Sequence, residues 1–102
     1  MRIIFEIAAN HTDVINDIVT QCEDSCLIKE KENLSGDQII AIIAIVTPVV
    51  WALVEKYLPD RMVTIQIELD EETTVTISER SIERALMKAK KIRSEWEKNK
   101  NN

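Results

Sequence analysis

Residues 39–54 form an uninterrupted run of sixteen residues without a charged side chain, and only Thr47 and Pro48 in it are not hydrophobic. The preceding Ser35-Gly36-Asp37-Gln38 matches a helix capping box, in which the serine and glutamine side chains satisfy amides of the first turn. We therefore expect an apolar helix that begins after this box and ends before Pro59, with a kink or break just before Pro48. The many β-branched residues in its first half leave a buried pair of strands as the alternative.

A helix that is hydrophobic all round must be buried on every side or lie in lipid. A chain of 102 residues builds two layers around one core, which cover only part of such a helix. The surplus surface is then expected to pack against a second copy or a partner protein. The candidate interface residues are Ile43, Val50, Trp51 and Val54, with Trp51 as the anchor because aromatic anchors dominate interface energies.

Two other fates of this run stay open, namely complete burial within the monomer and association with a membrane. Sixteen residues of helix span roughly 24 Å, which is less than the roughly 30 Å of a bilayer's hydrocarbon core. No cluster of Lys or Arg flanks either end of the run, so the usual orientation signal of a membrane helix is missing. Packing against protein is therefore favoured over insertion.

The rest of the chain alternates between strand and helix patterns. Strands are predicted at residues 2–8, 26–31, 63–69 and 73–78, and helices at 10–23 and from Ser78 or Glu79 to about residue 98. The expected fold class is α/β of the α+β type, a two-layer sandwich in the order β-α-(β)-α-β-β-α. Its sheet would be mixed or antiparallel and would surround the apolar central helix. A single domain is expected over residues 1–98, followed by a frayed tail at 99–102.

Charge divides the chain into two parts and argues against binding to nucleic acid. The net charge is −5, but residues 1–79 hold five Lys or Arg against fifteen Asp or Glu, whereas residues 80–102 hold eight against three. A nucleic-acid binder needs a basic face to neutralise phosphates, which this acidic bulk does not offer. The basic end is interpreted as a solvated helix face.

The residues that usually carry catalysis or metal binding are scarce. One glycine excludes a glycine-rich phosphate loop, and the single His11 supports no catalytic triad. Cys22 and Cys26 are too few for a structural zinc site and are expected to be reduced, as in a cytoplasmic protein. The chain is thus expected to be no enzyme and to use no metal, cofactor or small-molecule substrate.

The order of elements resembles the effector-associated constant component domains of bacterial conflict systems. The matching pieces are residues 2–7, the apolar run 39–54, the strand pair 63–69 with 74–77, and the helix 82–96. The chain lacks the Gly/Ala-rich central segment of that family. The resemblance implies a non-enzymatic adaptor that recruits or assembles an effector, and it transfers no site residues.

These observations predict a cytoplasmic protein–protein interaction or oligomerisation module, with an adaptor role in a bacterial defence or signalling system as its suggested setting. The first alternative is a membrane-associated component that uses residues 39–54. The second is a small acidic inhibitor that mimics nucleic acid towards a basic enzyme. The partner, the oligomeric state and the pathway are not encoded in any motif of the sequence.

Overall fold

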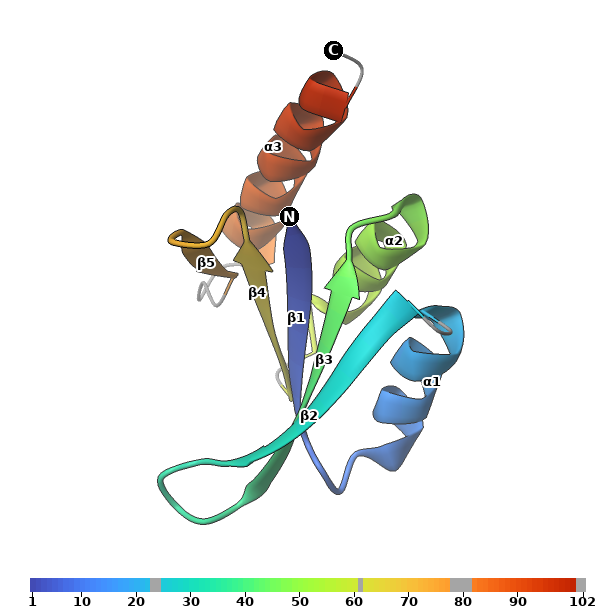
Figure 1. Ribbon diagram of the computed structural model, residues 1–102, viewed down its shortest axis with the longest axis vertical. Coiled ribbons are helices and arrows are strands. Elements are labelled where there is room, and N and C mark those ends of the chain that lie inside the picture. Colours follow the sequence, from blue (N-terminus) through green and yellow to red (C-terminus); the bar gives the residue numbers. More distant parts are fainter. Residues whose placement is uncertain (23–24, 61, 78–81, 101–102) are drawn as a thin grey trace.

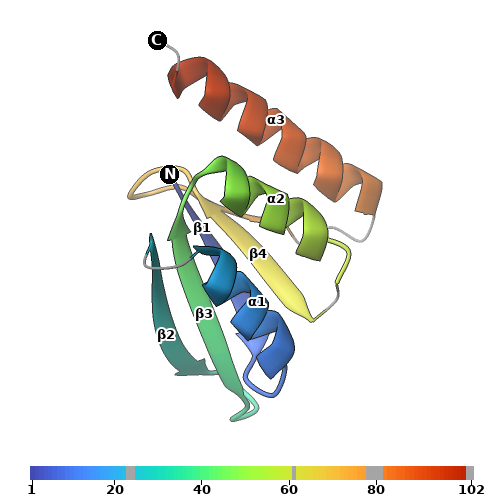
Figure 2. The ribbon, with the colours of Figure 1, turned by 90° about the vertical axis from the view of Figure 1, so that its right-hand side faces the viewer.

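In the computed structural model, which describes residues 1–22, 25–60, 62–77 and 82–100, five strands and three helices form an α+β fold. In chain order these are β1 Arg2–Ala8, α1 Thr12–Cys22, β2 Cys26–Glu32, β3 Gln38–Ile45, α2 Pro48–Tyr57, β4 Val63–Glu68, β5 Thr74–Ile77 and α3 Ile82–Lys100. The sheet has the strand order β2-β3-β1-β4-β5, and every neighbouring pair is antiparallel. All three helices lie on one side of it (Figures 1 and 2). The predicted α+β two-layer class with an antiparallel sheet is therefore confirmed.

The prediction of one long apolar helix is wrong for its first half. Residues Gln38–Ile45 form strand β3, which pairs with β1 on one side and with β2 on the other. Both faces of β3 are rich in Ile and Ala, so the alternation that marks a half-exposed strand is absent from the sequence. The β-branched residues fit a pleated strand better than a helix, where their side chains lose rotamer freedom.

The true helix start lies at Thr47, where the sequence predicted a break. The Thr47 hydroxyl accepts a hydrogen bond from the Val50 amide at 3.2 Å, and Thr47 itself has extended backbone angles. Pro48 takes the first helical position, where a missing N–H costs nothing and the fixed φ suits the helix. Helix α2 is consequently only ten residues long.

The expected capping box is instead a β-hairpin loop between β2 and β3. Asn33 organises this loop, because its side-chain oxygen accepts hydrogen bonds from the amides of Ser35 and Asp37, both at 2.9 Å. Gly36 has a φ of 83°, a left-handed conformation that glycine adopts without steric cost. The loop thus reverses the chain and lets β3 return beside β2.

The core lies between the sheet and the helices. The side chains of Ile3, Phe5 and Ile7 on β1 are fully buried under the helix layer. Trp51 and Val54 of α2 reach the same core, with 1% and 0% of their surface exposed. Since β1 is the central strand and α2 lies over the sheet, these residues hold the two layers together.

Helix α3 joins this core along one edge. Its Ala89 is buried, Ile92 and Trp96 are half-buried, and the Trp96 ring lies 6.5 Å from the Trp51 ring at an angle of 56°. Arg93 also forms a salt bridge of 3.2 Å with Glu55 of α2. The helix includes Asn99 and Lys100, which were expected in the frayed tail. Its predicted start at residues 78–79 and the end of the tail at residues 101–102 lie outside the described residues.

Candidate interaction surface

The side of the sheet away from the helices carries an apolar row across three strands. In the antiparallel register, Leu27 of β2 lies opposite Ile43 of β3, and Ile43 lies opposite Ile4 of β1. The row continues into Gln66 of β4 and Thr76 of β5. Because directly opposed residues point to the same side of an antiparallel sheet, these five side chains share one face. Its β2, β3 and β1 part is hydrophobic.

We call the hydrophobic part of this face the sheet-face patch and define it by five residues: Ile4, Leu27, Ile39, Ile43 and Ile45. Two of them are largely exposed, Ile45 at 61% and Leu27 at 53% of their surface. The other three are half-buried, since neighbouring side chains of the same sheet cover part of each. Contiguous exposed aliphatic side chains of this kind mark interaction sites more often than ordinary surface.

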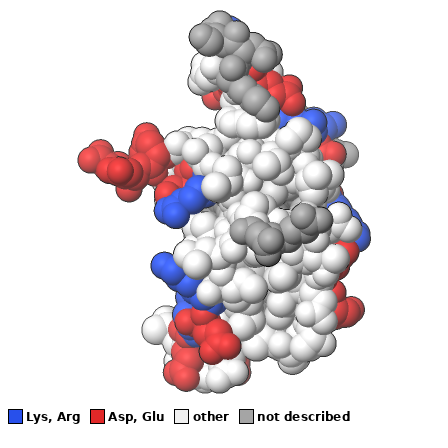
Figure 3. All heavy atoms as spheres, turned by 45° about the vertical axis from the view of Figure 1, so that its right-hand side comes forward, with Lys and Arg blue, Asp and Glu red and all other residues white. Residues whose placement is uncertain are grey.

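Charged pairs border the sheet-face patch. Arg2 and Glu68 lie opposite each other on β1 and β4 and form a salt bridge of 2.6 Å. Lys31 of β2 and Glu6 of β1 form a second salt bridge of 2.6 Å, which spans β3 near Ile39 and Ala41 and so separates Ile39 from the rest of the patch. Figure 3 views the molecule from another side and shows acidic and basic groups along both edges, with an uncharged area between them. An apolar centre with a polar rim is the usual anatomy of a protein–protein interface.

The structure divides the residues that the sequence nominated for an interface. Ile43 lies in the sheet-face patch, as a surface role requires. The other three are core residues of α2, with 1% of Val50, 1% of Trp51 and 0% of Val54 exposed. Their nomination assumed a helix with uncovered sides. Here α2 is short, and the sheet, α1 and α3 cover it.

Sequence reasoning missed four members of the patch, namely Ile4, Leu27, Ile39 and Ile45. For Leu27, the predicted short strand at residues 26–31 offered an indication, because an aliphatic residue there precedes the charged second half of the strand. For Ile45 the signal was hidden by the helix prediction, since only strand geometry places residues 43 and 45 on one face. The patch therefore depends on the strand assignment of β3.

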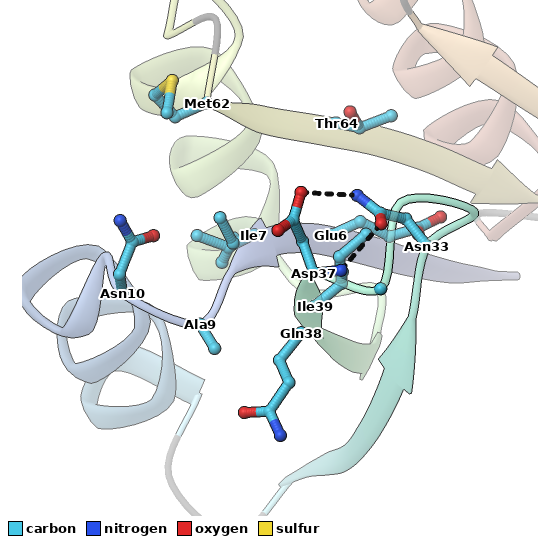
Figure 4. Close-up of a pocket in the computed structure, with 12 residues that line it drawn as sticks. Glu6, Ile7, Ala9, Asn10, Asn33, Asp37, Gln38, Ile39, Met62 and Thr64 are labelled. Atoms are coloured by element: carbon cyan, nitrogen blue, oxygen red, sulfur yellow. Dashed lines mark hydrogen bonds between the residues drawn. The ribbon is translucent and has the colours of Figure 1, made fainter.

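A hollow of about 750 Å³ opens beside the patch, between the β2–β3 loop, the β1–α1 connection and the start of β4. Figure 4 shows Asn33 and Asp37 bound to each other on one side of it, and Met62 and Thr64 on another. Part of its polar lining is engaged within the chain, because Glu6 pairs with Lys31 and the Asn33 amide donates to Asp37 at 3.5 Å. Its described lining residues show no arrangement of acid, base and nucleophile.

A polar cluster on the helix side joins α1 to α2. Asp17 accepts hydrogen bonds from Lys56, at 2.8 Å, and from the Tyr57 hydroxyl. The Lys56 hydrogen bond, followed by that of Tyr57, lowers the pKa of Asp17, and the same contact raises the pKa of Lys56. Burial, and then the hydrogen bond to Asp17, raises the pKa of Tyr57. The cluster ties the two helices together.

The remaining candidate groups stand apart. Cys22 is buried, and burial followed by the nearby Cys26 raises its pKa to about 11, which makes it a poor nucleophile at neutral pH. His11 is half-buried, and its Nε2 has no hydrogen-bond partner among the described residues. No group of three His, Cys, Asp or Glu within the described ranges could hold a metal ion.

Comparisons of the chain with family models, with curated proteins and with solved structures find no match. Within the part of the chain that the structure describes, no helix is long and apolar enough to cross a membrane.

Proposed function

We propose that this chain is a non-enzymatic protein–protein interaction or oligomerisation module, and that the sheet-face patch is its contact surface. The observation that supports the proposal is the exposure of Ile45 and Leu27, 61% and 53%, on the side of the sheet that bears no helix. Burying either side chain against a partner gains about 1.5–3 kcal/mol. The occupant is a second copy of the chain or a partner protein with a matching apolar surface.

Physical reasons favour protein rather than lipid as the occupant. The patch is bordered by the paired charges of Arg2 with Glu68 and of Lys31 with Glu6, which a protein partner can accommodate at its rim. The membrane alternative relied on an apolar helix over residues 39–54, whereas the structure has the strand β3 and the short helix α2 there. The same segment therefore supports the alternative less than the sequence suggested.

The acidic-inhibitor alternative lacks a supporting surface. A nucleic-acid mimic needs carboxylates in a row at the spacing of phosphates. The exposed acidic residues instead sit in separate places, in the β4–β5 loop, on β2 and at the start of α1. No observation on the described residues favours this function over protein binding.

A cytoplasmic adaptor is the form of this function that the sequence suggests. The order of elements still resembles the conflict-system domains outside residues 39–54, where the expected central helix is strand β3 followed by α2. The proposal of an adaptor therefore relies on the sheet-face patch, and the defence setting relies on the resemblance alone.

The test is self-association measured by light scattering after size exclusion, over a concentration series and without detergent. We expect the wild type to self-associate and Ile45→Lys to associate approximately tenfold to hundredfold more weakly, because a buried aliphatic contact is lost. Leu27→Lys should behave in the same way. Met87→Lys is the matched control, since Met87 is 72% exposed and belongs to α3, a helix on the other side of the sheet.

The outcomes separate the possibilities. Loss of association in Ile45→Lys and Leu27→Lys, with Met87→Lys unchanged, supports the patch as the interface. Equal effects of all three variants would mean that added charge alone disperses the assembly. A wild type that stays monomeric at every concentration would contradict the oligomerisation form of the proposal.

A further inference from the structure

The sheet ends in two strands whose outer edges have no neighbour in the described part of the chain, β2 and β5. Strand β2 is seven residues long, and every residue after Cys26 is exposed. An edge of this kind presents unpaired backbone N–H and C=O groups that can bind another strand. Natural proteins usually place charges on such edges to control which strands can pair.

The charges on β2 are sorted by face. Lys29 and Lys31 share the helix-free side with Leu27, because they lie opposite Ala41 and Ile39 of β3. Glu30 and Glu32 point to the helix side, together with Ile28. Lys31 is engaged with Glu6, so Lys29 carries most of the basic character of the β2 edge on the helix-free face, whereas the other face of the edge is acidic.

The β5 edge has the opposite arrangement of charge. The β4–β5 loop holds Asp70, Glu71 and Glu72, and it lies at this edge on the far side of the sheet from α3 (Figures 1 and 2). The Asp70 carboxylate accepts hydrogen bonds from the Glu72 and Thr73 amides, both at 2.8 Å, which fixes the loop and leaves the other two carboxylates exposed. On the helix side, the element beside β5 is α3, with seven Lys or Arg against three Glu over residues 82–100.

These charges exclude two of the simple ways in which copies could pair. A symmetric pair of β2 strands runs antiparallel and keeps matching faces together, so the lysine rows would meet on one face and the glutamate rows on the other. If β2 of a second copy were added to the β5 edge with its helices on the opposite side of the sheet, Lys29 and Lys31 would lie near the basic helix α3. Both arrangements place like charges side by side.

One arrangement remains complementary on both faces. When β2 of a second copy is added to the β5 edge with its helices on the same side, its lysines face the acidic β4–β5 loop and its glutamates face α3. The added strand then runs parallel to β5, because the four successive antiparallel pairings from β2 to β5 leave these two strands pointing the same way.

We propose that copies of this chain assemble head to tail, with β2 of one copy extending the sheet of the next at β5. The inference rests on the proposed function for its assembly role but uses the edges of the sheet instead of the sheet-face patch. Strand β5 has only four residues, so the contact is short. Because the contact joins two different edges, each added copy leaves an edge for the next, and the assembly is expected to grow with concentration rather than close as a fixed dimer.

The test is a charge swap followed by sedimentation velocity over a concentration series. Lys29→Glu alone, or Glu71→Lys with Glu72→Lys, should weaken association by about threefold to tenfold, because attraction at one face becomes repulsion. Combining the changes in one chain, or mixing the two variants in equal amounts, should restore the wild-type association. Raising the salt concentration should weaken the wild-type contact.

Far-UV circular dichroism of each variant confirms that the fold is retained, which is expected for exposed positions. Failure of the combined or mixed variants to recover, or a wild-type dimer that does not grow, overturns the edge inference. Association that is lost in Ile45→Lys but not in Lys29→Glu also overturns it, and leaves the sheet-face patch as the interface. Association that is lost in Lys29→Glu, restored by the swap and unchanged in Ile45→Lys supports the edges and contradicts the patch.

Discussion

The stability of a Trp51 variant tests whether this residue belongs to the core or to an interface. Only 1% of the Trp51 surface is exposed, and the centroid of its ring lies 6.5 Å from that of the Trp96 ring. An indole of this kind buries about 150–250 Å², which corresponds to roughly 4–6 kcal/mol at about 25 cal/mol per Å². Large-to-small substitutions of buried aromatic residues cost about 3–5 kcal/mol. We therefore expect Trp51→Ala to lower the free energy of unfolding by about 4 kcal/mol.

Trp51→Phe should be much milder for a specific reason. The Trp51 Nε1 is buried without a hydrogen-bond partner among the described residues, and an unsatisfied buried donor costs about 1–3 kcal/mol. Phenylalanine loses some packing area but also removes this donor, so the net cost should stay below about 2 kcal/mol.

The assay is urea denaturation followed by far-UV circular dichroism, with the thermal midpoint as a second readout. Each kcal/mol lowers the midpoint by about 4–8 °C in a domain of this size. Trp51→Ala should therefore melt at least about 15 °C below the wild type. A Trp51→Ala variant that melts within a few degrees of the wild type but no longer associates would refute the core assignment and favour the interface role.

Three further predictions concern local features. Thr47→Ala removes the cap of α2 and should cost about 1 kcal/mol in urea denaturation, whereas Thr47→Ser should cost little. The pKa of Asp17 is lowered by its hydrogen bond with Lys56, so its contribution to stability is present above pH 3.8 and is lost as the pH falls through the lower folded value. Asp17→Asn should flatten the wild-type loss of stability in that acid range, and an unchanged slope would contradict this origin. With maleimide at pH 8, half-buried Cys26 should react in the native state, whereas Cys22, with a pKa of about 11, should react only after unfolding; mass spectrometry of digested peptides distinguishes the two.

Elements with one dominant face were predictable. The alternation in β4 and β5 predicted two neighbouring strands, and the structure pairs them as a hairpin with residues 69–73 between them. The apolar stripe of α1 likewise predicted a helix over nearly its full length. In both cases one face is buried and the other is wet, so the period of the pattern reveals the element.

Strand β3 was not predictable from its pattern because both of its faces are apolar. Ile42 and Ala44 are buried under the helices, while Ile43 and Ile45 face the other way. A continuous apolar run carries neither the period of a helix nor that of a strand. Ser35 through Gln38 then appeared to supply a helix start, although Gly36 was the better indication of a turn.

The interface prediction for the residues of α2 was wrong for the same reason, because it assumed a helix over residues 39–54. A helix over residues 39–54 would have left Trp51 on an uncovered side, whereas a helix that begins at Pro48 places Trp51 against the sheet. Ile43 remained a candidate because it is only half-buried and lies on the helix-free side of the sheet. Pairing between strands distant in sequence decided the outcome, and no local pattern encodes that pairing.

The central position of β1 in the sheet affects how this protein folds while it is synthesised on the ribosome. Strand β1 is synthesised before its neighbours β3 and β4, and Arg2 is paired with Glu68, 66 residues further along the chain. At about 5–20 residues per second, several seconds of translation separate the two. During that interval the future core residues of β1 have no native strand beside them. The sheet can close only when β4 emerges, and folding of this domain should therefore be a late, cooperative event.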